Sequence, residues 1–120
     1  MKNEIIREVV LKYIKEKPAL IRLKVDLNSQ TSEITLKGQN LDKKFEYSES
    51  IDFNSFAHGV IEAYKEIYGD LEAIPISFRE EIYDNEKVSL DLYPTGSAGI
   101  FDIFIEYKEK GENEKKNVSF

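Results

Sequence analysis

The stretch FNSFAHGVIEAYKEIYG, residues 53–69, decides the fold class of this 120-residue chain. Its apolar side chains recur every three to four positions, which predicts an amphipathic α-helix. Asp52 or Asn54 can cap the start of this helix, and Gly69 can end it in a left-handed conformation. Such a helix is stable only on an apolar surface, and the flanking sequence predicts a β-sheet to provide it.

The upstream residues predict one helix followed by three strands. Apolar side chains between Ile5 and Ile14 follow helical spacing, and we expect Asn3 to cap this helix and Pro18 to stop it. Apolar and polar residues then alternate over 21–27, 33–37 and 44–48, with short polar turns between the segments. This pattern is typical of an antiparallel meander.

The downstream residues predict a closing hairpin after an ambiguous segment. Pro75 interrupts the pattern, and residues 77–83 fit a short helix or an irregular loop almost equally well. Residues 88–92 and 101–107 alternate on either side of the turn at residues 94–99, PTGSAG, and should pair with each other.

We therefore expect an α+β fold, with a single antiparallel sheet of about five strands and two main helices packed on it, in the order α-β-β-β-α-(α)-β-β. Residues 1–107 are expected to form one domain, because a chain of this length leaves little room for two. Residues 108–120 are almost entirely polar, and they are expected to form a solvated tail.

Composition excludes several functional classes. The chain has no cysteine, which rules out disulfides, thiolate nucleophiles and zinc ribbons, and a single histidine rules out sites that need two. No apolar run approaches the roughly 18 residues that a membrane span needs. The first residues lack the layout of a signal peptide, so we expect a cytoplasmic protein.

The residues that could carry chemistry do not form a recognisable motif. His58 lies beside the apolar stripe of its helix, without a nearby carboxylate and nucleophile in sequence. The acidic residues at 84–86 lack the spacing of a calcium loop, and adjacent glutamates at 80–81 would point about 100° apart on a helix. The turn at 94–99 lacks the lysine and helix of a phosphate-binding loop. We expect no catalytic residue, metal or cofactor.

Charge gives the main functional indication. The net charge is −6, and residues 62–91 contain nine acidic and three basic residues, which accounts for all of it. Such a surface repels nucleic acid and anionic lipid and attracts cationic proteins, although it can also serve solubility alone. If it serves recognition, the expected contacts are acidic residues and two tyrosine anchors. They are Glu72, Glu80, Glu81, Asp84, Glu86 and Asp91, with Tyr83 and Tyr93 as the anchors.

The element order, the small acidic chain and the closing hairpin ending in FDIFIEY (residues 101–107) resemble the small α+β immunity proteins of bacterial toxin–immunity systems, including contact-dependent inhibition systems. The resemblance implies tight binding to one cognate toxin, often a cationic nuclease, and inhibition by covering its active site or substrate surface. The resemblance assigns no functional residue, because these proteins are diverse.

Other interpretations remain open at this point. A small-molecule-binding or enzymatic domain would place a pocket between sheet and helices, around His58 or Arg79. An edge strand such as Phe45–Tyr47 can pair with a second copy, so a homodimer is possible. Phe104 is equally compatible with an exposed position and with packing against the first helix.

Overall fold

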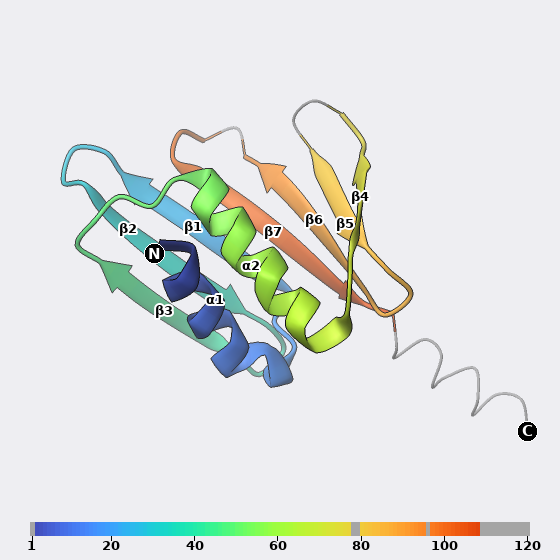
Figure 1. Ribbon diagram of the computed structural model, residues 1–120. Coiled ribbons are helices and arrows are strands. Elements are labelled where there is room, and N and C mark those ends of the chain that lie inside the picture. The colour runs from blue at the N-terminus through green and yellow to red at the C-terminus, as the bar shows by residue number, and fades with distance from the viewer. Residues whose placement is uncertain (1, 78–79, 96, 109–120) are drawn as a thin grey trace, which may run out of the picture.

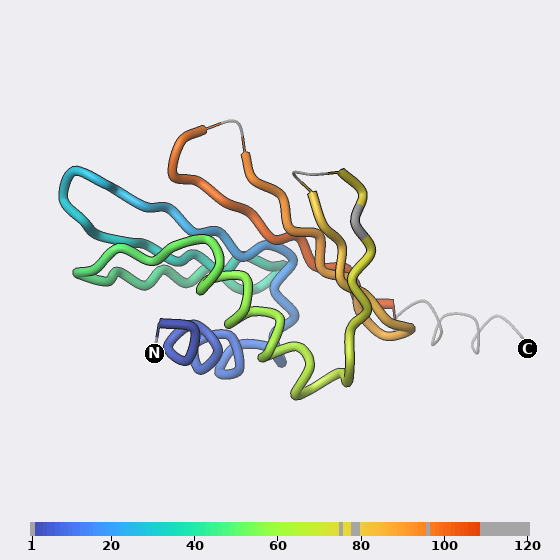
Figure 2. The backbone as a smooth tube through the Cα atoms, turned by 45° about the horizontal axis from the view of Figure 1, so that its top comes forward, coloured from blue at the N-terminus to red at the C-terminus, as the bar shows by residue number. Residues whose placement is uncertain are grey.

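The computed structural model describes residues 2–77, 80–95 and 97–108, and shows two helices on one side of an antiparallel sheet (Figures 1 and 2). The elements in chain order are α1 (Lys2–Tyr13), the 3₁₀ turn η1 (Ile14–Glu16), β1 (Leu20–Asp26), β2 (Thr31–Lys37), β3 (Asp42–Tyr47), α2 (Phe53–Tyr68), β4 (Glu72–Pro75), β5 (Glu81–Asp84), β6 (Val88–Pro94) and β7 (Ile100–Tyr107).

The sheet consists of two meanders joined in its middle. Its strand order is β3-β2-β1-β7-β6-β5-β4, so β1 pairs with β7 while every other pair is sequential. All pairs are antiparallel. Every strand-to-strand connection except the one through α2 is therefore a local hairpin, which is the arrangement that short polar turns favour.

The helices form as their sequence patterns predict, with two differences at their ends. Asp52 caps α2, because its side chain accepts a hydrogen bond of 2.7 Å from the backbone N–H of Ser55. Gly69 follows α2 with φ +92° and ψ −178°, so its φ is positive but it does not adopt the left-handed helical conformation that was expected. Asn3 lies inside α1 and does not cap it, so that expectation is wrong. The helical segment ends with η1, two residues before Pro18, which agrees with the prediction.

The core lies between the two helices and the middle of the sheet. Ile6 and Val10 of α1 and Phe56 and Tyr64 of α2 are fully buried, and they pack in one cluster with apolar residues of β1, β2, β6 and β7 such as Leu23. The helices approach closely at Gly59, where an added Cβ would lie 2.7 Å from the carbonyl oxygen of Asn3. This close contact fixes the helix pair as one layer over the sheet.

The prediction of about five strands is wrong, since the described residues form a sheet of seven. Residues 72–75 and 81–84 form the hairpin β4–β5, and the short helix considered for residues 77–83 is absent from their described part. Each of these strands has only four residues, too few for a clear period of two, and β5 is held in place by pairing with β6. The fold class and the two main helices are confirmed.

A single asparagine connects the additional hairpin to the rest of the fold. The side-chain nitrogen of Asn85 donates to the carbonyl oxygens of Tyr68 and Asp70, while its side-chain oxygen accepts from the backbone of Lys87 and Val88. These four bonds tie the end of α2 to the β5–β6 turn. They explain why the chain can reverse here without a glycine in the turn.

The chain leaves the sheet at Lys108, which belongs to the predicted tail. Its amine contacts the carboxylate of Asp84 at 3.0 Å, and its backbone N–H donates to the carbonyl of Lys87. The remaining residues of that predicted tail, 109–120, lie outside the described residues. Among the helices of the described chain, none combines the length and apolar character required to cross a membrane.

Candidate functional site

In the described part of the chain, the helices cover one face of the sheet and leave the other open (Figure 2). Because side chains alternate between the two faces along each strand, the register assigns every residue to the helix-covered face or to the open face. Phe104 pairs with Leu20 of β1 and Asp91 of β6 on the open face, and 45% of its surface is exposed. The alternative in which Phe104 packs beneath α1 is therefore wrong.

The β4–β7 half of the open face is acidic, and we call it the acidic half-face. The register places five carboxylates on it, and Glu80 joins them through its contact with Asp91. Apolar side chains from β4, β5, β6 and β7 lie between these charges. The acidic residues are Glu72, Glu80, Asp84, Asp91, Asp102 and Glu106, and the apolar and aromatic ones are Ile74, Ile82, Tyr93 and Phe104.

Some of the residues proposed from the sequence come together on the acidic half-face, and others do not. Glu72, Glu80, Asp84, Asp91 and Tyr93 belong to it, and Tyr93 is 47% exposed. The remaining three lie elsewhere. Glu81 and Tyr83 are on the helix side of β5, where the Tyr83 hydroxyl donates to the Glu81 carboxylate, and Glu86 is exposed in the β5–β6 turn.

Four members of the acidic half-face were not expected from the sequence, namely Ile74, Ile82, Asp102 and Glu106, and Phe104 was expected there only as one of two alternatives. Asp102, Phe104 and Glu106 come from β7, outside the acidic segment 62–91. Their period-two spacing does signal a shared face, opposite Phe101, Ile103 and Ile105. The signal was incomplete because only the β6–β7 pairing puts that face beside Asp91.

Two of the carboxylates on the half-face are neutralised within the chain. Arg22 makes a two-pronged contact with Asp102, with nitrogen–oxygen distances of 2.7 and 3.0 Å, and the Asp102 side chain is only 5% exposed. This hydrogen bond also raises the pKa of Arg22. Lys108 neutralises Asp84 in the same way. Glu72 and Glu106 are exposed and have no ion pair within the described part of the chain, so they are available to a partner.

Asp91 is a carboxylate of the acidic half-face whose surroundings disfavour its charged form. Its Oδ1 atom is buried and has no hydrogen-bond partner in the described structure. Burial, followed by a hydrogen bond and repulsion from the carboxyl of Glu80, raises the pKa of Asp91 from 3.8 to about 6. At neutral pH the pair therefore carries charge at a cost in stability, which an incoming cation would reduce.

A groove on the other side of the sheet runs between α2 and strands β5 and β6. It encloses about 340 Å³, and its lining includes Phe53, Ala57 and Leu92 together with Glu81 and Tyr83. His58 and Lys65 of α2 also line it. The groove thus combines an apolar wall with ionisable groups of both signs, at the place where a ligand pocket around His58 was considered. Arg79, the other residue considered for such a pocket, lies outside the described residues.

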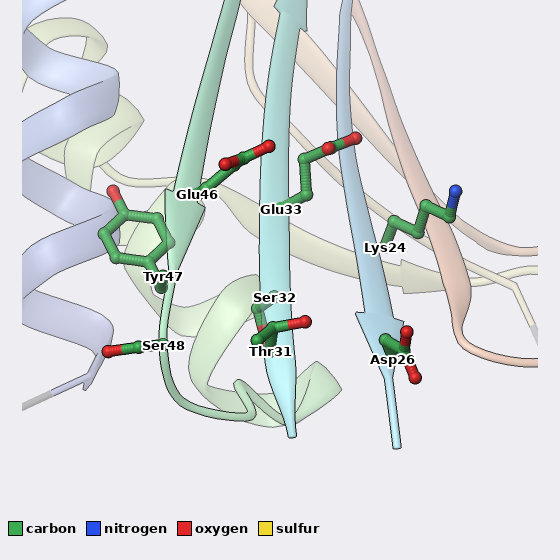
Figure 3. Close-up of a pocket in the computed structure, with 8 residues that line it drawn as sticks. All are labelled: Lys24, Asp26, Thr31, Ser32, Glu33, Glu46, Tyr47 and Ser48. Atoms are coloured by element: carbon green, nitrogen blue, oxygen red, sulfur yellow. The ribbon is translucent and has the colours of Figure 1, made fainter. Parts of the chain in front are cut away.

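A larger and more polar hollow, of about 530 Å³, lies at the end of β1, β2 and β3 (Figure 3). Glu33 and Glu46 lie opposite each other on neighbouring strands, with Lys24 opposite Glu33 on its other side. Within the described residues, no group of three or more histidine, aspartate or glutamate side chains is arranged to hold a metal ion.

No protein-family model, curated protein or solved structure matches this chain.

Proposed function

We propose that this protein is a non-enzymatic inhibitor that binds a cationic protein, as an immunity protein binds its toxin. The observation that carries the proposal is the acidic half-face, an uncovered sheet surface with exposed aromatic side chains among carboxylates. A covered sheet face stabilises a fold, whereas an uncovered one with Phe104 and Tyr93 exposed offers contact area to a partner.

Charge and aromatic area would have separate roles in binding. The carboxylates of Glu72 and Glu106, which form no ion pair with any described residue, would attract a basic surface over distance and speed association. Tyr93 and Phe104 would be buried on contact and slow dissociation, since aromatic side chains near the centre of an interface contribute most of its affinity. Inhibition then follows from covering the basic active site or substrate surface of the toxin.

The test uses the purified product of the gene that adjoins the gene for this chain, which the proposal expects to be a toxin, and a charge-reversed variant, Glu72→Lys/Glu106→Lys. Both side chains are exposed and lie on the acidic half-face, so the fold should tolerate the change. We expect association at low salt to slow by about tenfold or more, with a weaker dependence on salt. Surface plasmon resonance at several ionic strengths measures both quantities.

The matched control is Glu8→Lys/Glu16→Lys, which makes the same change in net charge on the helix side of the molecule. Both residues are exposed in α1 and η1. At physiological ionic strength this variant should associate within about threefold of the wild-type rate, since charges beyond a Debye length of roughly 8 Å are then screened. Equal slowing by the two variants, or no binding by the wild-type chain, would refute recognition through the acidic half-face.

The groove beside α2 favours a second candidate function, a small-molecule-binding domain. Its volume of about 340 Å³ falls within the range of ligand sites, and His58, Lys65 and Glu81 give it polar groups of both signs. Fragment screening by NMR, with chemical shifts followed at His58, separates the candidates. Saturable shifts confined to the groove, and retained in Glu72→Lys/Glu106→Lys, would support this second function.

A further inference from the structure

The two edges of the sheet differ in how well they are protected. At the β4 edge, the backbone N–H of Ile76 donates to the carbonyl of Glu80. Because hydrogen-bonded and non-hydrogen-bonded pairs alternate along the strands, this bond determines which residues of β4 bond to β5. Ala73 and Pro75 therefore direct their backbone away from β5, and proline has no N–H to offer. A strand of four residues with proline at an outward position is a typical protected edge.

The β3 edge lacks these protections. The backbone N–H of Gly38 donates to the carbonyl of Leu41 at 2.8 Å, so Lys43, Phe45 and Tyr47 bond to β2. The N–H and C=O groups of the alternate residues then point outward. These residues are Asp42, Lys44 and Glu46, and their backbone groups have no partner among the described residues.

The side chains of β3 also indicate a missing partner. Glu33 and Glu46 form a directly opposed pair of the closely spaced kind, and Figure 3 shows both on the same face. Like charges in this position destabilise a sheet. Lys44 lies 3.9 Å from Glu33, but within the described chain no cation lies within 4.0 Å of the Glu46 carboxylate. Glu46 therefore lacks a counter-charge along an unpaired edge.

We propose that β3 pairs with β3 of a second copy of this chain, antiparallel and with the two-fold axis at Phe45. On the open face, Lys44 then lies opposite Glu46 of the partner subunit, and this pair occurs twice. On the helix side, Phe45 lies opposite Phe45 of the partner subunit, and Lys43 lies opposite Tyr47 of the partner subunit. This one register thus forms salt bridges, an aromatic pair and a cation–π contact between the two subunits.

Neighbouring registers place like charges opposite each other. Moving the two-fold axis to Lys43, Lys44 or Glu46 places that residue opposite its own copy, and therefore puts like charges against each other across the edge. The axis at Phe45 avoids this. The side chains on the helix side are also suited to burial, since Phe45 and Tyr47 are half-buried and Ile5 of the overlying α1 is 36% exposed.

The dimer does not depend on the proposed function, because β3 is at the far end of the sheet from β4. Pairing would join the two sheets into one and would leave the acidic half-faces at its opposite ends. A dimeric inhibitor would therefore present two separate binding surfaces, and its avidity would depend on how its targets are arranged.

A charge swap tests the register. Sedimentation equilibrium of the full chain should show a reversible dimer, and Lys44→Glu or Glu46→Lys should each weaken it roughly tenfold or more, because each single change creates two like-charge pairs. The double variant Lys44→Glu/Glu46→Lys restores opposite charges and should recover dimerisation. The control Lys15→Glu, on η1, should dimerise like the wild type. Circular dichroism checks that every variant is folded.

A disulfide tests the geometry independently, since the chain has no cysteine of its own. The residues facing each other at the axis form a pair with Cα atoms about 4.5 Å apart, which a disulfide can span. Phe45→Cys should therefore oxidise to a covalent dimer, whereas Lys43→Cys should not, because it faces residue 47. A wild-type chain that is monomeric at millimolar concentration, or a double variant no better than the single ones, would overturn the proposal.

Discussion

Replacing Asp91 by asparagine should stabilise this protein at neutral pH and leave it unchanged near pH 4. The Asp91 carboxylate is buried at one oxygen and lies against the carboxyl of Glu80. Asparagine has nearly the same shape, carries no charge and can donate a hydrogen bond to Glu80, as protonated Asp91 does. The substitution therefore mimics the protonated state at every pH.

The magnitude follows from the pKa of Asp91, which burial and Glu80 raise from 3.8 to about 6. Because the folded chain binds this proton more tightly than the unfolded chain does, wild-type stability is greatest below the unfolded pKa and falls as pH rises from about 4 to about 6. The full pKa difference between the folded and the unfolded chain corresponds to about 3 kcal/mol in the free energy of unfolding. The side chain is partly open to solvent, so screening reduces the expected effect to about 1–2 kcal/mol.

Urea unfolding at pH 4 and pH 7.5, followed by circular dichroism, measures the effect. We expect the difference in free energy of unfolding between Asp91→Asn and wild type to be near zero at pH 4 and about 1–2 kcal/mol in favour of the variant at pH 7.5. The contributions of Asp26 and Asp52 to the pH dependence of stability cancel in this difference, because backbone hydrogen bonds lower their pKa values in both proteins. A difference that is the same at both pH values would refute the electrostatic reasoning.

Two further substitutions test the packing of the core. Gly59→Ala places a Cβ 2.7 Å from the carbonyl oxygen of Asn3 and from the Cβ of Ile6, so it should lower the free energy of unfolding by about 1–3 kcal/mol; an unchanged melting temperature would show that α1 and α2 separate easily. Tyr107→Phe removes the hydroxyl that lies 2.6 Å from the buried Tyr64 hydroxyl, and should cost about 1–2 kcal/mol in urea unfolding; an equally stable variant would mean that Tyr64 finds another partner.

The predicted elements were confirmed where a long segment shows a clear helical or strand periodicity of its apolar residues. Residues 53–68 form α2 because their apolar residues share one helical face, and the hairpin of β6 and β7 forms around its turn for the same local reason. The β4–β5 hairpin was not predicted. Its strands are too short to show a pattern, and pairing with β6 and the bonds of Asn85 hold them in place.

The sequence by itself determined the helices, the meander, the closing hairpin and the net charge, because all of these depend on nearby residues. Only the tertiary structure decided which sheet face stays uncovered and which charges share it. The pairing of β7 with β1 and β6 places Glu106 on the same face as Glu72, and Asp102 beside Arg22, although these residues are far apart in sequence. The pairing of β5 with β6 makes residues 81–84 a strand and so puts Glu81 on the opposite face from Asp84, since side chains three residues apart on a strand point to opposite sides.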